Sequence, residues 1–334
     1  MNKGVKQGYI YVFLSAILWG MLPVFTRLLY AAGSTPLEVS SVRAYLGAGM
    51  ALLAMLFSGD IRKCRLKDVP FYMLYGTFAI AGAFLFYALS MRLLSTAMAA
   101  VLLYTGPAFV NIFNRILYKI PITPVKWTAL VLTVAGCALV VRIYDLASLK
   151  VNAVGILIGL LSGICYSITT VMSRKAKEKY CGRMNGWLIL ILGTLPFWVI
   201  SPPWRIPAPT PQQWVLFVGI AGCCSMIPYT VYLTALDGEL DGGVASIVAT
   251  AEPIAATLFG TIFFGDKLEK LQIAGIVVVI IGVIIPILSE LSEQGGIGGS
   301  FAEKNSGGST QKRRKSRYER ENKEICGRTK LKNF

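Results

Sequence analysis

Residues 249–260 read ATAEPIAATLFG and lie inside an apolar run that extends from about residue 242 to residue 264. A carboxylate and a helix breaker, Glu252 and Pro253, stand side by side in the middle of this run, and the next ionisable residue is Asp266. A carboxylate at bilayer depth costs about 2.5–3.5 kcal/mol on insertion scales, so Glu252 should face a polar interior or a partner. Because proline removes a backbone donor, the stretch predicts a membrane helix that is interrupted at Pro253.

The composition is that of a membrane protein. Of the 334 residues, 55% are hydrophobic and 15% are charged, whereas a soluble domain carries about 25% charged residues. Histidine is absent from the sequence, which removes the commonest metal ligand and general base. The seven cysteines show no CxxC spacing. We therefore expect no metal site, no cofactor and no disulfide framework.

A membrane-spanning helix needs about 20 apolar residues, and ten runs in the chain qualify. The expected spans are residues 9–30, 36–57, 69–90, 95–117, 125–143, 153–173, 184–201, 213–236, 242–264 and 271–288. The first run could be a signal peptide, but it is longer than a typical h-region and a second span follows at once. The sequence therefore predicts an all-α polytopic membrane protein with ten transmembrane helices.

Lysine and arginine are distributed unevenly between the two sides of these spans. With the N-terminus inside, the inner segments before the tail carry 14 of them and the outer segments carry 7. This asymmetry predicts a multi-pass protein of the cell membrane with both termini in the cytoplasm. It also explains the net charge of +16 without a nucleic-acid partner. The remaining partners that we expect are the lipid bilayer and a small-molecule substrate.

A faint internal repeat relates the two halves of the chain. At an offset of 146 residues, the segment 104–107 (YTGP) falls under the segment 250–253 (TAEP), so that Pro107 matches Pro253 while the carboxylate has no counterpart. Five spans per half is an odd number, so the second half must enter the membrane the other way up, as in many secondary transporters. We expect one inverted five-helix repeat in residues 1–147, the other in 148–288, and a disordered basic cytoplasmic tail in 289–334.

Several motifs give the sequence a family resemblance. They are LSAILWG (14–20) in the first span, Arg43 in the second, YTGPAFV (104–110) in the fourth, and AEPIAATLFG (251–260) followed by FFGDKL (263–268) in the ninth. The sequence resembles the drug/metabolite transporter superfamily, in particular its EamA-like ten-span members. The resemblance implies transport by alternating access, most often export of amino acids or related compounds. Such families often carry an acidic residue after the fourth span, where this chain has Tyr118-Lys119-Ile120-Pro121.

Two charged residues within spans are the first candidates for contact with a polar solute. Arg43 lies about seven residues into the second span, and Glu252 lies near the middle of the ninth. Opposite charges in one membrane interior tend to pair, so the alternatives are a shared central cavity, a structural ion pair, or an Arg43 that extends to the interface. Glu252 is also the only plausible deep proton carrier, because the chain has no histidine and no lysine at the centre of a span.

Aromatic residues within the spans are the second group of candidates, although most such residues simply pack. The candidates are Trp19, Tyr87, Tyr104, Tyr166 and Tyr229, of which Trp19 and Tyr166 are repeat partners. Small residues recur seven apart in helices five and ten, as Ala129 and Gly136 and as Gly275 and Gly282. Small residues let helices approach closely in lipid, which predicts either a homodimer through these two helices or packing within the chain.

Signatures of enzymes are missing from the sequence. It has no P-loop, no nucleophile elbow and no HExxH motif, and no intramembrane carboxylate pair that could hold Mg²⁺. We therefore expect a protein that is not an enzyme, namely a secondary transporter that moves a small metabolite. The alternative is a membrane-embedded enzyme or accessory factor that acts on lipid-linked substrates.

Overall fold

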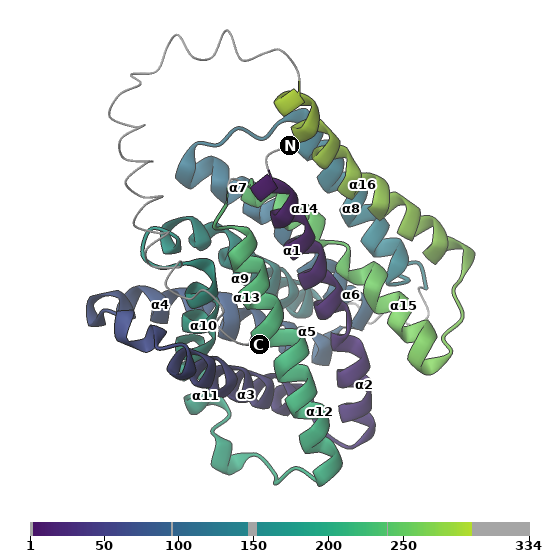
Figure 1. Ribbon diagram of the computed structural model, residues 1–334. Helices are drawn as coiled ribbons and strands as arrows, with labels where there is room; N and C mark the ends of the chain where they lie inside the picture. The colour runs from purple at the N-terminus through teal and green to yellow at the C-terminus, as the bar shows by residue number, and fades with distance from the viewer. Residues whose placement is uncertain (1–2, 95, 146–151, 239, 296–334) are drawn as a thin grey trace.

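The computed structural model describes residues 3–94, 96–145, 152–238 and 240–295 (Figure 1). Within these residues the chain is helical and contains no β-strand. Nine helical segments of this part are long and apolar enough to cross a membrane. A tenth, α8 (Pro124–Val140), has 17 residues, which is the lower limit for a span. The predicted all-α polytopic membrane fold is therefore confirmed.

The helices begin and end close to the expected positions. The first five spans are α1 (Lys3–Gly20) with α2 (Leu22–Ala31), α3 (Pro36–Phe57), α4 (Val69–Gly76) with α5 (Ala83–Leu93), α6 (Thr96–Leu103) with α7 (Gly106–Tyr118), and α8. The other five are α9 (Ala153–Ala176), α10 (Gly182–Gly193) with α11 (Leu195–Ile200), α12 (Pro211–Ala221) with α13 (Ile227–Ala235), α14 (Gly242–Ala249) with α15 (Glu252–Phe264), and α16 (Lys270–Gly295).

The last helix is longer than expected. It continues to Gly295, seven residues past the predicted end of the span and into the segment that we expected to be disordered. Residues 289–294 read SELSEQ, and most of them are tolerated well in helices. The first helix breakers after residue 288 are the paired glycines at 295 and 296. The rest of the expected tail, residues 296–334, lies outside the described residues.

Four spans are interrupted, and a proline follows each interruption. The fourth span breaks between Leu103 and Gly106 and the ninth between Ala249 and Glu252, as the prolines indicated. Two further breaks, at Met21 and Thr194, were not predicted. In all four cases a proline is the second residue of the continuing helix, where its missing N–H and fixed φ are tolerated.

Two other spans change to π-helical geometry half-way along their length. The segment Thr77–Gly82 joins α4 to α5, and the segment Gly222–Met226 joins α12 to α13. These positions correspond at an offset of about 145 residues, close to the offset of the sequence repeat. Helical turns of this kind are rare and often occur at functional sites. Nothing in the apolar pattern of these spans indicated them.

Helices α8 and α16 lie side by side at one edge of the bundle (Figure 1). A Cβ added at Gly136 would lie 2.8 Å from the backbone nitrogen of Val279, and one at Gly275 would lie 2.9 Å from that of Val140. The two small-residue faces therefore pack on each other within the chain, as close helix pairs in lipid do. A homodimer through these helices would have to use their other faces, so the small residues no longer argue for it.

One end of the bundle, which we call the basic end, carries the loops around residues 58–68, 119–123, 177–181 and 236–241. Ion pairs join the two halves of the chain there. Asp60 is fully buried and pairs with Arg183 at 2.7 Å and with Lys63 at 2.7 Å. Lys126 pairs with Asp241 at 3.0 Å. The Asp60–Arg183 and Lys126–Asp241 pairs link the two halves, so movement that separates the halves at this end would break them.

Asp237 lies at the basic end, just after α13. Its carboxylate accepts a hydrogen bond from the backbone N–H of Gly182, the first residue of α10. Burial raises the pKa of Asp237 to about 7, an effect that the hydrogen bond from Gly182 opposes. The nearby Cys181 also raises this pKa, and Lys177 lowers it.

This raised pKa predicts a pH-dependent stability. An unfolded aspartate has a pKa of about 3.9, so the folded protein binds the proton more tightly than the unfolded chain does. The resulting stabilisation is fully present below the unfolded pKa and is lost as the pH rises through about 7. We expect the midpoint of thermal unfolding to fall between about pH 6 and pH 8 and to fall less in an Asp237→Asn variant. Equal slopes for the two proteins would contradict this assignment.

Candidate functional site

The seven predicted site residues come from seven different spans and meet in the interior of the bundle. The ring of Trp19 on α1 lies 6.2 Å from that of Tyr166 on α9 and 5.4 Å from that of Tyr229 on α13, measured between centroids. Glu252, the first residue of α15, is close enough to interact electrostatically with each of the other candidates that can carry a charge. These are Arg43, Tyr87, Tyr104, Tyr166 and Tyr229.

Arg43 is held by the π-helical segment Gly222–Met226. Its Nε donates to the hydroxyl of Ser225 at 2.6 Å, and its Nη2 donates to the carbonyl of Cys224 at 2.6 Å. The guanidinium carbon lies 4.0 Å from the ring centroid of Phe84. Arg43 is only 8% exposed, so it does not extend to the interface.

A direct ion pair between Arg43 and Glu252, which was one of the three alternatives, is absent among the described side chains. The physical reason is that the π-helical segment already supplies a hydroxyl and a carbonyl to the guanidinium, with an aromatic face beside it. Hydrogen bonds to a buried charged group stabilise it strongly. Removing the charge of Glu252 would therefore leave Arg43 with its partners.

Glu252 lies at the point where the two interrupted spans approach each other. It directly follows the break of the ninth span, so the positive end of the α15 dipole stabilises its carboxylate. Tyr104, in the break of the fourth span, lies close enough to that carboxylate to stabilise its charge. The two breaks that the sequence repeat identified are thus joined through one tyrosine–glutamate contact.

The site residues differ in how much surface they retain. Glu252, Tyr87, Tyr104 and Tyr166 are half-buried. In contrast, Trp19 and Tyr229 are 4% and 2% exposed and, like Arg43, have little surface that a solute could contact. The first four are therefore the candidates for direct contact with a solute. Trp19, Tyr229 and Arg43 are buried among other side chains of the site.

A cavity of about 490 Å³ reaches this region from the end of the bundle opposite the basic end. Tyr87, Tyr104 and Pro253 lie at its deep end, next to Glu252. The other lining residues are Pro23, Val24, Arg27, Ala100, Val140, Val141, Arg142, Ala256, Thr257, Gly260, Phe264, Asp266, Lys267, Leu268 and Gln272. Both halves of the chain contribute to the lining, so the cavity lies between them.

The mouth of the cavity carries charged side chains that we did not predict as site residues. Arg27 pairs with Asp266 at 3.0 Å, and both side chains are about half exposed. Arg142 pairs with Glu269, whose other carboxylate oxygen accepts from Tyr144 at 2.7 Å. Asp266 belongs to the FFGDKL stretch, so a family signal existed for it. Arg27 offered only its position at the end of a span.

The polar groups of the described part of the chain suit hydrogen bonding rather than metal binding. This part contains no group of three or more histidine, cysteine, aspartate or glutamate side chains that could hold a metal ion. Glu252 and Tyr166 are not lining residues of its cavity, although Glu252 directly precedes the lining residue Pro253. The lining of the cavity includes Tyr87, Tyr104 and Thr257. Such a set suits hydrogen bonding to a polar solute.

Comparison with known proteins identifies the family. The EamA-like transporter family matches residues 6–142 and, separately, residues 153–288. The chain belongs to the EamA-like transporter family. The boundary between the two matches falls between α8 and α9. Each match contains one of the two spans that the sequence repeat pairs, namely the span interrupted next to Pro107 and the span interrupted next to Pro253. The protein is accordingly a multi-pass membrane transporter by family.

Relatives in the family are distant but extend over most of the chain. A protein named as an uncharacterized transporter of Archaeoglobus fulgidus is 26% identical over 284 residues, which cover 84% of this chain and 96% of that protein. A similarly named protein of Clostridium kluyveri is 23% identical over 292 residues, 84% of this chain and 93% of its own. The threonine/homoserine exporter RhtA of Salmonella typhimurium is 24% identical over 247 residues, 72% of this chain and 78% of its own.

A solved crystal structure has the same fold. It aligns with a TM-score of 0.71 and covers 86% of this chain and 98% of its own, at 16% sequence identity. This likeness shows the arrangement of helices alone. The transport chemistry has to be argued from the residues of this chain.

Proposed function

We propose that the protein is a secondary transporter that exports a small polar metabolite, an amino acid or a related compound, across the cell membrane by alternating access. The observation that carries the proposal is the contact between Glu252 and Tyr104 at the deep end of the cavity. It joins the interrupted helices of the two halves and retains accessible surface. In transporters, interrupted helices at the repeat interface supply the substrate site.

The proposal includes two inverted five-helix repeats that move against each other. Three correspondences support it, namely the breaks at Pro107 and Pro253, the two π-helical segments, and the separate family matches to each half. In the structure the cavity opens away from the basic end, where ion pairs join the halves. Alternating access would break the ion pairs at the basic end that link the two halves as the cavity closes at its mouth.

The class of substrate follows from the chemistry at the deep end. A carboxylate and nearby tyrosine hydroxyls suit a solute with an ammonium group and further polar groups. The name of the Salmonella relative, a threonine/homoserine exporter, points to the same class at low identity. The lysine and arginine asymmetry supports an orientation with both termini in the cytoplasm and the cavity open to the outside.

The alternative function, an enzyme or accessory factor for lipid-linked substrates, has less support. Glu252 is the only acidic residue deep within a predicted span, whereas a Mg²⁺-dependent reaction on a phosphate would need further acidic ligands. The family is one of transporters. That the protein is not an enzyme stays part of this proposal.

The proposal predicts exchange of a labelled solute across a membrane. Purified protein in liposomes that are loaded with unlabelled amino acids should accumulate a labelled amino acid by counterflow, and protein-free liposomes should not. A panel that contains hydroxylated, acidic, basic and apolar amino acids would identify the substrate. Absence of counterflow across the panel, with protein that is folded and correctly inserted, would contradict amino-acid transport.

A further inference from the structure

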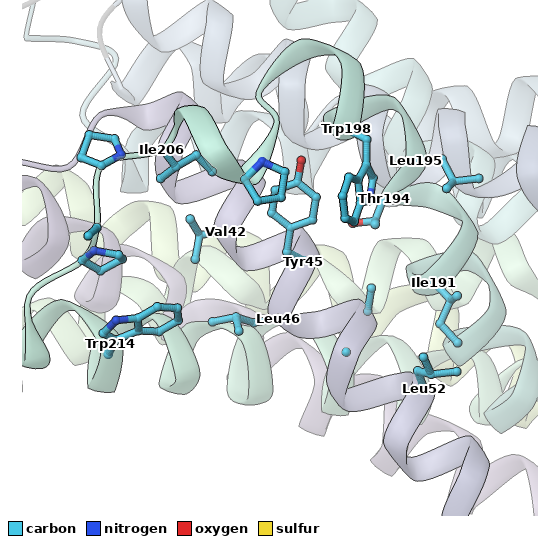
Figure 2. Close-up of a pocket in the computed structure, with 16 residues that line it drawn as sticks. Val42, Tyr45, Leu46, Leu52, Ile191, Thr194, Leu195, Trp198, Ile206 and Trp214 are labelled. Atoms are coloured by element: carbon cyan, nitrogen blue, oxygen red, sulfur yellow. The ribbon is translucent and has the colours of Figure 1, made fainter.

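A second cavity lies on the outer surface of the bundle, away from Glu252. It is a groove of about 650 Å³ between α3, α10, α11 and the segment that leads into α12 (Figure 2). Its lining is mostly aliphatic, aromatic and proline side chains. The lining residues are Val42, Tyr45, Leu46, Ala48, Gly49, Leu52, Ile191, Thr194, Leu195, Trp198, Pro203, Ile206, Pro207, Ala208, Pro209 and Trp214.

The polar groups in this lining are few. The hydroxyl of Tyr45 donates to the carbonyl of Ser201 at 2.9 Å. The hydroxyl of Thr194 is buried and has no hydrogen-bond partner in the structure. The groove therefore offers little to a polar solute, and an apolar occupant fits its chemistry.

The length of the groove corresponds to one leaflet of a bilayer. Its wall on α3 extends from Val42 to Leu52, a rise of roughly 15 Å at 1.5 Å per residue. This is about half of the hydrocarbon thickness of about 30 Å. The outer end of the groove lies at Trp214 and Pro209, near Trp204, which is 73% exposed. Exposed tryptophans of this kind mark the membrane interface.

A cation stands near the interfacial end of the groove. Arg205 is exposed, and it directly precedes the lining residue Ile206. Among the described residues it forms no ion pair. Arginine presents a planar set of donors that matches the oxygens of a phosphate.

We propose that the groove holds an acyl chain of an anionic phospholipid, with the phosphate of that lipid at Arg205. The apolar lining, the one-leaflet length and the interfacial arginine each match one part of such a lipid. The occupant would lie against the face of α3 next to the one that carries Arg43. It would thereby fix α3 against α10 and α12, independently of the transported solute.

Gly49 allows the groove to be filled from within. It is an exposed residue of α3 in the lining, and a Cβ added there would meet no atom within 4 Å. A Gly49→Phe variant should therefore fold and place its ring where the acyl chain would lie. A matched control is Val131→Phe on α8, because Val131 is 63% exposed and lies outside the groove.

The test is native mass spectrometry of detergent-purified protein titrated with phosphatidylglycerol or phosphatidylcholine. Wild-type protein and Val131→Phe should retain one phosphatidylglycerol molecule in preference to phosphatidylcholine. Gly49→Phe should bind it roughly tenfold more weakly, since exclusion of even two methylene groups has that effect. Arg205→Gln should bind both lipids alike.

Three results would overturn the proposal. The first is equal phosphatidylglycerol affinity in wild-type and Gly49→Phe proteins. The second is a wild-type protein that retains detergent only. The third is a wild-type dimer that Gly49→Phe converts to monomers without a change in lipid binding, because a second copy would then be the occupant. Transport assays do not enter this test, so its failure leaves the proposed function unaffected.

Discussion

Replacement of Glu252 by glutamine should leave the protein folded and reduce transport by about ten- to a hundredfold. A hydrogen bond to a charged group contributes about 1.5–3 kcal/mol, and the loss of one such bond to the substrate corresponds to this range. The fold should survive because Arg43 is held by Ser225 and Cys224, and Glu252 is not its direct partner. Counterflow and thermal unfolding measured on the same preparation separate the two effects.

The matched control for this variant is Glu38→Gln. Glu38 forms the capping box at the start of α3 with Thr35, and glutamine keeps such a box intact. The same chemical change there should leave transport unaltered. If Glu252→Gln transports at the wild-type rate, Glu252 does not contact the substrate.

The same variant separates the two roles left open for Glu252. If the carboxylate carries the coupling proton, Glu252→Gln should lose accumulation driven by a pH gradient but retain exchange of solute. If it only contacts the substrate, accumulation and exchange should fall together. Comparison of gradient-driven uptake with counterflow in the same liposomes decides between them.

A Gly182→Val variant should fail to give stable, monodisperse protein. A Cβ at this position would lie 2.1 Å from the carbonyl oxygen of Leu233 and 2.6 Å from the Cα of Thr234. Both are backbone atoms of α13, so relief of the clash requires α10 and α13 to separate. Overpacking in a well-packed core typically costs about 1–3 kcal/mol and occasionally more, and a clash with backbone belongs at the upper end.

The control is the same change at Gly4, an exposed residue of α1. Its Cβ would meet no atom within 4 Å, so Gly4→Val should behave like the wild type. Fluorescence-detected size-exclusion chromatography after heating gives the comparison. Equal stability of the two variants would show that α10 and α13 do not approach as closely as the structure indicates.

The structure also shows which parts of the site could be inferred from composition and pattern. Trp19, Tyr104 and Glu252 were identified because aromatic and charged side chains stand out within apolar spans, where a charged group is costly unless it faces the interior of the bundle. The acceptors of Arg43 were not identified. Cys224 and Ser225 look like ordinary core residues, and they lie about 180 residues away along the chain.

The sequence by itself determined the number of the spans and most of their limits, because hydrophobic length must match the bilayer; the start of the first helix and the end of the last lie six and seven residues outside the predicted limits. It also determined the interruptions at Pro107 and Pro253, because proline acts on its own backbone. The tertiary structure alone decided that Arg43 pairs with the π-helical segment, and that the glycines of α8 and α16 face each other. These depend on the approach of distant segments, which leaves no periodic trace in the local sequence. Apolar patterning states that a face is buried, whereas the choice of its partner depends on the shape and hydrogen-bonding groups of the whole bundle.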